Sequence, residues 1–120
     1  MVYYGKYAEY FEIGRTELIR AIGVSYKEIE EKNVMLPVVE YQVRYFKPAK
    51  YDDVLRIKTT LNELPTVRFI TECEIYNQEE QLLAVGKVVL VFVNSDTGRP
   101  IKCPNWILDR LRERWKPKTS

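Results

Sequence analysis

The chain has 120 residues, of which 46% are hydrophobic and 30% charged, and its formal net charge is +2. This length and composition predict one globular domain over residues 1–120 with a single core. The absence of histidine excludes Ser-His-Asp and Cys-His catalytic systems and the common His-containing metal sites, so we expect no metal and no cofactor. The mild charge, without a block of basic residues, argues against nucleic acid as a partner.

The cysteines and the longest apolar run bear on the cellular compartment. Cys73 and Cys103 lie far apart without a CxxC motif, which predicts buried thiols rather than a disulfide framework or a zinc site. The run 82–93 contains Lys87 and is too short to cross a bilayer, and no leader-like segment opens the chain. We therefore expect a cytoplasmic protein without a membrane span.

Helical periodicity marks the beginning and the end of the chain. Apolar residues recur at helical spacing from Tyr7 to Ile22, which predicts one long amphipathic helix that ends at Gly23. Ser25 then caps a short helix, and Glu28 completes a capping-box pattern. A last helix is expected at the surface after Pro104, with an apolar stripe formed by Ile107, Leu108, Leu111 and Trp115.

Between these helices the pattern alternates, as in strands with one dry face and one wet face. Three such segments cover 39–45, 55–62 and 67–76, and the run 82–93 reads as a central strand covered on both sides. We predict an α+β chain with four strands in an antiparallel meander, wrapped around the long helix. This is the hot-dog arrangement.

The first twenty residues carry a more specific signal. The segment VYYGKYAEYFEIGRTELIR resembles the motif that opens the central helix of hot-dog acyl-CoA thioesterases related to 4-hydroxybenzoyl-CoA thioesterase and the Tol-Pal-associated thioesterase. The likeness continues through 36–53, 86–93 and 97–100, and it implies hydrolysis of acyl-CoA or acyl-carrier-protein thioesters. The matching positions of the motif are Val2, Tyr3, Tyr4, Tyr7, Phe11, Glu12 and Arg15.

One departure from the family pattern concerns the catalytic aspartate. In the family this residue and a whole first strand precede the Val-Tyr-Tyr run, whereas this sequence begins with that run. The resemblance then implies substrate binding with reduced turnover, and a start codon assigned too late or a truncation is the simplest account. If the strand is genuinely lost, the alternative function is a non-catalytic acyl-thioester binding or interaction module.

The resemblance also assigns catalytic roles at the start of the long helix. The backbone N–H of Tyr4 or Gly5 is the implied donor to the thioester oxygen, because amides in a first helical turn favour negative charge. Some hot-dog thioesterases use a glutamate on the central helix, which makes Glu12 the candidate carboxylate. The competing interpretation is that Glu12 and Arg15, three residues apart, form an ion pair.

Candidate substrate-binding residues come from the helix and from the strands. Tyr3 and Tyr7, together with Tyr4, either line the acyl pocket or form an ordinary wall between helix and sheet. Lys87 either meets a CoA phosphate or extends to an interface, and three further cations either contact the nucleotide 3′-phosphate or lie on a solvated face. These three are Arg56, Lys58 and Arg68.

The predicted sheet leaves an open edge strand, which also bears on assembly. Pairing two subunits edge to edge removes that edge and places each active site between two chains. We therefore expect a homodimer or a homotetramer.

Overall fold

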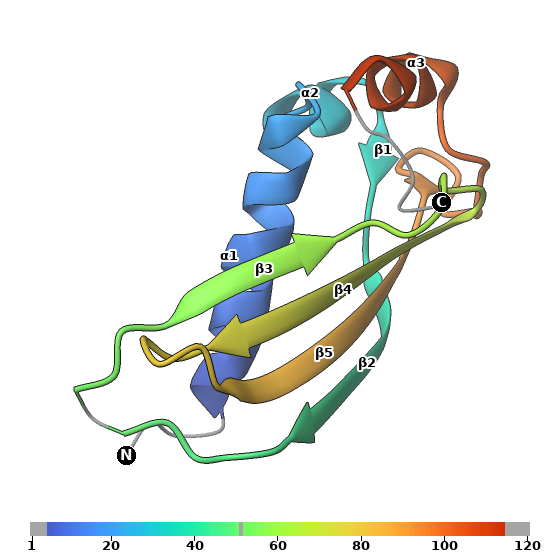
Figure 1. The fold of residues 1–120 in the computed structure, drawn as a ribbon. Helices are drawn as coiled ribbons and strands as arrows, with labels where there is room; N and C mark the ends of the chain where they lie inside the picture. The colour runs from blue at the N-terminus through green and yellow to red at the C-terminus, as the bar shows by residue number, and fades with distance from the viewer. Residues whose placement is uncertain (1–4, 51, 115–120) are drawn as a thin grey trace.

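The computed structural model describes residues 5–50 and 52–114, and for residues 5–8 it describes the backbone only. Helix α1 (Gly5–Ala21) crosses behind a twisted sheet, and the helices α2 (Tyr26–Glu31) and α3 (Asn105–Arg114) lie together at one end of the molecule (Figure 1). No helix in these ranges is long and apolar enough to cross a membrane. The strands are β1 (Val34–Met35), β2 (Val38–Tyr45), β3 (Arg56–Thr60), β4 (Arg68–Tyr76), β5 (Leu82–Val91) and β6 (Val93–Asn94).

The main sheet is antiparallel with the strand order β2-β5-β4-β3. The strands β3, β4 and β5 follow one another as predicted, but the expected four-strand meander is wrong, because β2 pairs with β5. The connection 46–55 carries the chain from β2 across to the opposite edge of the sheet. A second, two-stranded sheet joins β1 to β6, and strands of two residues are too short to show an alternating pattern.

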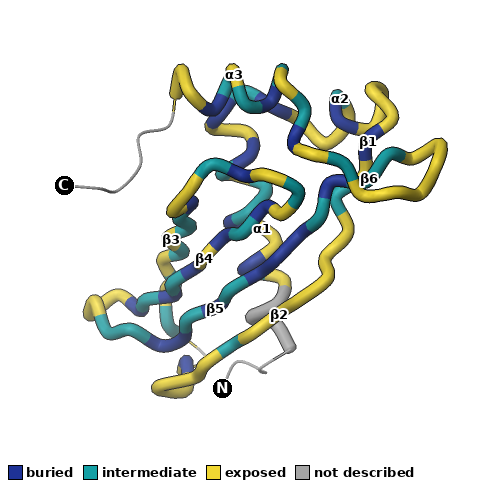
Figure 2. Tube along the Cα trace, turned by 90° about the vertical axis from the view of Figure 1, so that its right-hand side faces the viewer, coloured by how far each residue is buried: buried dark blue, intermediate teal, exposed yellow. Residues whose placement is uncertain are grey.

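The core lies between α1 and the sheet. The predicted dry face of β4 is buried, since Phe69, Thr71, Cys73 and Ile75 are all buried. Buried and less buried positions alternate along β4 (Figure 2). Both cysteines are buried and free, as predicted. The expectation that 82–93 is covered on both faces is only partly correct, because the outward-facing side chains of Val85 and Lys87 are partly exposed.

Helix α1 ends where the sequence predicts. Gly23 has φ +82°, a left-handed conformation that glycine adopts without strain. The side chain of Ser25 accepts a hydrogen bond from the backbone N–H of Glu28 at 3.1 Å and so caps α2.

Helix α3 fastens this end of the molecule through Arg110. Its guanidinium forms a two-pronged ion pair with the Glu28 carboxylate, donates to the Gly23 carbonyl at 2.8 Å, and stacks on Trp106. The Glu28 side chain thus binds Arg110 instead of completing the capping box. As expected for a surface helix with an apolar stripe, α3 buries Ile107 and Leu111.

The pair between Glu28 and Arg110 predicts a pH dependence of stability. The hydrogen bond from Arg110 lowers the pKa of Glu28 in the folded protein. Its stabilising contribution is therefore present above the unfolded-state pKa, about 4.3, and is lost as the pH falls through the lower folded value. We expect Glu28→Gln to lower Tm at neutral pH and to make Tm fall less steeply on acidification, whereas Glu31→Gln on the same helix keeps the wild-type slope. Identical acid slopes for both variants in thermal scans would contradict this assignment.

Candidate functional site

The first turn of α1 supplies the backbone N–H groups of the candidate site. The helix begins at Gly5, and the N–H groups of a first helical turn have no partner within the helix. No acidic side chain lies in this turn, so the positive end of the helix dipole is not neutralised by the helix itself. Such a position is suited to bind an oxygen that carries or gains negative charge.

Close packing of Phe11 fixes the position of this helix start relative to the sheet. Phe11 is 1% exposed, and its ring centre lies 5.9 Å from that of Tyr41 on β2. The ring also rests on Gly86 of β5, where an added Cβ would lie 2.6 Å from it. Phe11 follows Gly5 by six residues, about 9 Å along the helix axis, so the Phe11 contact holds the first turns of α1 over β2 and β5.

A second close contact holds the middle of α1. A Cβ added to Gly14 would lie 3.3 Å from the sulfur of Cys73 and closer still to the hydroxyl of Thr59. The Thr59 hydroxyl and the Cys73 sulfur are themselves 3.4 Å apart. The helix backbone therefore approaches β3 and β4 directly, and α1 has little freedom to shift along the sheet.

Tyr41 is a residue that the sequence did not single out. It shares the helix-facing side of β2 with Val43 and Tyr45, as the alternation along the strand requires. Burial raises the pKa of Tyr41 to about 12, and the neighbouring Tyr45 adds to the rise. The phenol therefore stays protonated at neutral pH and is available as an O–H donor on the face of the sheet that carries α1. Its aromatic character and its place in the alternation were visible in the sequence, but its contact with Phe11 was not.

The candidate residues on the helix are only partly within the described structure. Tyr3 and Tyr4 lie outside it, and Tyr7 belongs to α1 with its side chain outside the described part. Glu12 is exposed, seven residues or about 10 Å beyond the helix start. The alternative ion pair is not formed, since Arg15 Nε donates to the hydroxyl of Tyr26 at 3.2 Å and no ion pair joins it to Glu12.

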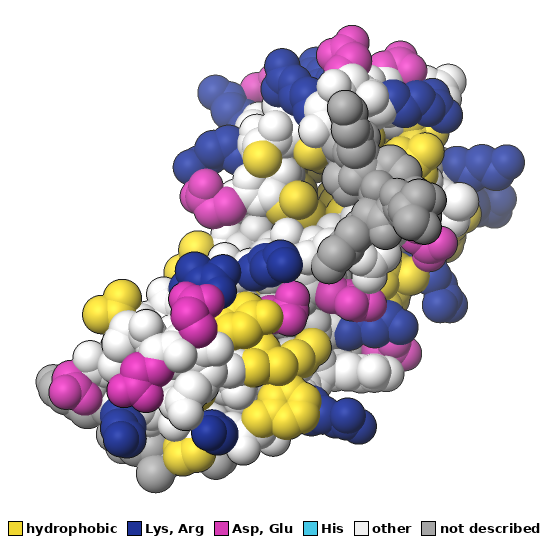
Figure 3. Space-filling model, viewed as in Figure 1, with side chains coloured by type: hydrophobic (Ala, Val, Ile, Leu, Met, Phe, Trp, Pro, Cys, Tyr) yellow, Lys and Arg dark blue, Asp and Glu magenta, His cyan; other side chains and the backbone are white. Residues whose placement is uncertain are grey.

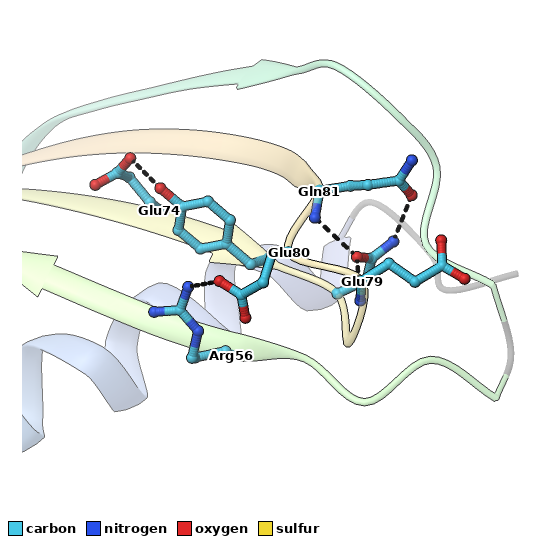
Figure 4. Close-up of polar contacts among 7 residues, drawn as sticks. Arg56, Glu74, Glu79, Glu80 and Gln81 are labelled. Atoms are coloured by element: carbon cyan, nitrogen blue, oxygen red, sulfur yellow. Dashed lines mark hydrogen bonds and ion pairs between the residues drawn. The ribbon is translucent and has the colours of Figure 1, made fainter.

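The four candidate cations of the strands all lie on the outer face of the sheet, opposite α1. Figure 3 looks onto this face and shows basic and acidic side chains mixed across it. Arg56 pairs with Glu80 and stacks on the ring of Tyr76, whose hydroxyl donates to Glu74 (Figure 4). The structure does not bring these cations to the helix start. The four are Arg56, Lys58, Arg68 and Lys87.

Metal binding finds no support in the described ranges. They contain no cluster of three or more histidine, cysteine, aspartate or glutamate side chains placed to hold a metal ion.

An antiparallel sheet wrapped around a central helix is the architecture of the hot-dog thioesterases. The chain belongs to the Thioesterase-like superfamily, whose family profile matches residues 1–111. It is 28% identical to a putative acyl-CoA thioesterase, YneP, of Bacillus subtilis over 88% of this chain and 80% of that protein. It is 27% identical to the acyl-CoA thioester hydrolase YbgC of Escherichia coli over 94% of this chain and 84% of that protein.

A solved structure gives the same result for the fold. The DHNA-CoA thioesterase from Staphylococcus aureus superposes with a TM-score of 0.80 and 28% sequence identity, covering 96% of this chain and 83% of that one. The predicted hot-dog architecture is therefore confirmed.

Proposed function

We propose that this chain hydrolyses acyl-CoA thioesters and that the backbone amides at the start of α1 hold the thioester oxygen. The observation that carries this proposal is the first turn of α1, whose N–H groups have no partner within the helix and which contains no acidic side chain. Donors fixed at the position where negative charge develops are usually the largest single contribution to catalysis of acyl transfer. The names of YneP and YbgC support CoA thioesters as the substrate class, in preference to acyl-carrier-protein thioesters.

The reaction also needs a group that activates water. A carboxylate takes a proton from water while the water oxygen attacks the carbonyl carbon. The carbon–sulfur bond then breaks, and the proton passes from the carboxyl group to the departing CoA thiolate. On the described part of the chain, Glu12 is the candidate that the resemblance supplies. Its exposure leaves the carboxylate accessible to water.

The direct test is thiol release from a panel of aliphatic and aromatic acyl-CoAs by the full chain. Aromatic substrates belong in the panel because the Staphylococcus aureus relative is a DHNA-CoA thioesterase. Glu12→Gln is assayed beside Glu9→Gln, another exposed glutamate on α1. Turnover lost only in Glu12→Gln assigns water activation to Glu12, and turnover kept in both assigns it to another group. Binding of acyl-CoA without turnover would instead indicate a binding module.

We further propose that two copies pair through the free edge of β2. This strand exposes apolar side chains along its length, with Val39 57% exposed and Tyr41 43% exposed. The opposite edge strand, β3, carries the cations Arg56 and Lys58, and charged side chains discourage edge pairing. Pairing at β2 would place the start of α1 beside the partner subunit and is compatible with further assembly to a tetramer in the cytoplasm.

A lysine on the β2 edge is expected to weaken such a dimer. In Val39→Lys the two-fold symmetry brings two new charges into the interface, and juxtaposed like charges cost several kcal/mol, so we expect dissociation to become at least about tenfold easier. Val54→Lys is the control, because Val54 is 71% exposed in the connection to β3. Sedimentation equilibrium reports the mass, and an unchanged mass for Val39→Lys across concentrations would exclude this edge.

A further inference from the structure

A groove lined mainly by apolar side chains lies between α1 and the edge strand β3, apart from the helix start. It has a volume of about 440 Å³. Among the described residues that line it, Glu17 carries a charge, and its carboxylate lies 3.1 Å from a guanidinium nitrogen of Arg20. The apolar residues of the lining are Ile13, Leu18, Ala21, Leu55 and Ile57.

This groove is a part of the helix–sheet layer that the described residues leave unfilled. Ile57 on β3 lies directly opposite Ile75 on β4, so both side chains are on the side of the sheet that faces α1. Ile75 is 0% exposed, whereas Ile57 stays partly exposed. Ile13 on α1 is 52% exposed although it lines the same groove. A continuous apolar surface of this kind marks a place where another segment packs.

The end of α3 lies at the same end of the molecule as the last turn of α1 (Figure 1). Arg110 donates to the Gly23 carbonyl at 2.8 Å, and a Cβ added to Gly23 would touch the guanidinium of Arg114, the last residue of α3. Gly23 is two positions beyond Ala21, which lines the groove. The positions that follow Arg114 therefore start within the length of one arginine side chain of Gly23, beside the groove.

Residues 115–120 follow Arg114 and lie outside the described residues. Six extended residues span about 20 Å, whereas α1 rises by about 12 Å from Ile13 to Ala21. This segment is therefore long enough to reach along the whole groove.

The composition of the segment also matches the groove. Its sequence is WKPKTS, an aromatic residue followed by two lysines. A tryptophan ring buries about 150–250 Å² and needs a hydrogen-bond acceptor for its N–H, and the hydroxyl of Thr59 in the lining is a suitable one. The exposed carboxylate of Glu17 at the groove attracts a lysine ammonium group.

Addition of the segment to the sheet as a fifth strand is disfavoured. Among the described residues, β3 pairs with β4 and its other edge carries no strand. Pro117 has no N–H to donate to that edge. With the tryptophan turned towards α1, alternation would also place both lysines of the segment on the outer face, beside Arg56 and Lys58 of β3, where like charges repel. The groove is therefore better filled by side chains than by a ladder of backbone hydrogen bonds.

We propose that residues 115–120 dock into the groove between α1 and β3, with the ring of Trp115 against its apolar lining and a lysine beside Glu17. The docked segment completes the helix–sheet layer at this edge. It also covers the edge of β3 against a second chain, which leaves β2 as the edge open to pairing. This inference does not depend on the proposed function.

The test is thiol labelling of Ile13→Cys in the full chain and in the same chain shortened to end at Arg114. We expect labelling to be at least about tenfold faster in the shortened chain, because a docked segment protects the groove until it opens locally. Val54→Cys is the control, since Val54 is 71% exposed and does not line the groove, and it should react at one rate in both chains. Both native cysteines are buried, so their labelling would report unfolding of the shortened chain.

Point variants test the same inference without shortening the chain. Trp115→Ala should raise the labelling rate of Ile13→Cys as the truncation does, whereas Thr119→Ala should leave it unchanged. Oxidation of Trp115→Cys/Leu55→Cys should give a disulfide within one chain. Labelling of Ile13→Cys at one rate in the full chain, the shortened chain and the Trp115→Ala variant would overturn the inference, and so would a disulfide formed only between two chains, since the groove would then receive a second copy.

Discussion

Replacing Gly5 by proline is expected to lower kcat for acyl-CoA hydrolysis by about 10²–10³, the usual cost of losing one oxyanion donor. Proline is well tolerated at the first position of a helix, where its N–H would have no helical partner. It nevertheless removes the N–H that we assign to the thioester oxygen. Gly5 begins α1, so the substitution separates loss of the donor from loss of the helix.

The control for this substitution is Gly5→Ala, which keeps the N–H and also suits a helix. Steady-state kinetics on one acyl-CoA, with circular dichroism to verify the helix content, compares the two variants. We expect the alanine variant to stay within a few-fold of the wild type. Equal losses in both variants would place the donors elsewhere, or would show that the lack of a Cβ at Gly5 matters more than its N–H.

The helices and the four long strands could be predicted from the sequence because local patterns determine them, whereas the two-residue strands β1 and β6 could not. The helical spacing that ends at Ile22, the left-handed Gly23 and the Ser25 cap all appear in the structure where the residues indicate them. The strand order could not be predicted in the same way. Alternation shows which face of a strand is dry, but it does not show which strand lies beside it, and β2 pairs with β5 across the whole intervening hairpin.

The candidate site also has a part that the sequence predicts and a part that it does not. The helix start follows from a contiguous motif, so Gly5 was accessible to sequence reasoning. The contacts that position it were not, because Phe11 meets Tyr41 and Gly86 only once the sheet has formed. The cations of the strands had two interpretations, contact with CoA or a solvated face. A polar position in an alternating strand indicates only the wet face, and here that face is opposite α1.

A methyl group on Gly86 is expected to destabilise the fold by about 1–3 kcal/mol, the usual cost of overpacking a core. The added Cβ would lie 2.6 Å from the ring of Phe11, a fully buried side chain. Since β5 is hydrogen-bonded on both sides, its backbone cannot move away without disturbing β2 and β4. Urea unfolding of Gly86→Ala measures the loss, and a wild-type midpoint with an unchanged slope would mean that α1 shifts to accommodate the methyl group.

A double-mutant cycle identifies the source of that strain. Phe11→Leu alone leaves a space over Gly86 and should cost about 1–3 kcal/mol through lost packing. Combined with Gly86→Ala, the smaller side chain makes room for the methyl group. The double variant should therefore lose about 1 kcal/mol less stability than the sum of the losses of the two single variants. Additive costs would locate the strain in the strand rather than at the contact with Phe11. The same contact holds the first turns of α1, so Gly86→Ala should also lower kcat. The double variant should have a kcat closer to the wild-type value than Gly86→Ala has, because the packing under the helix positions the groups at its start.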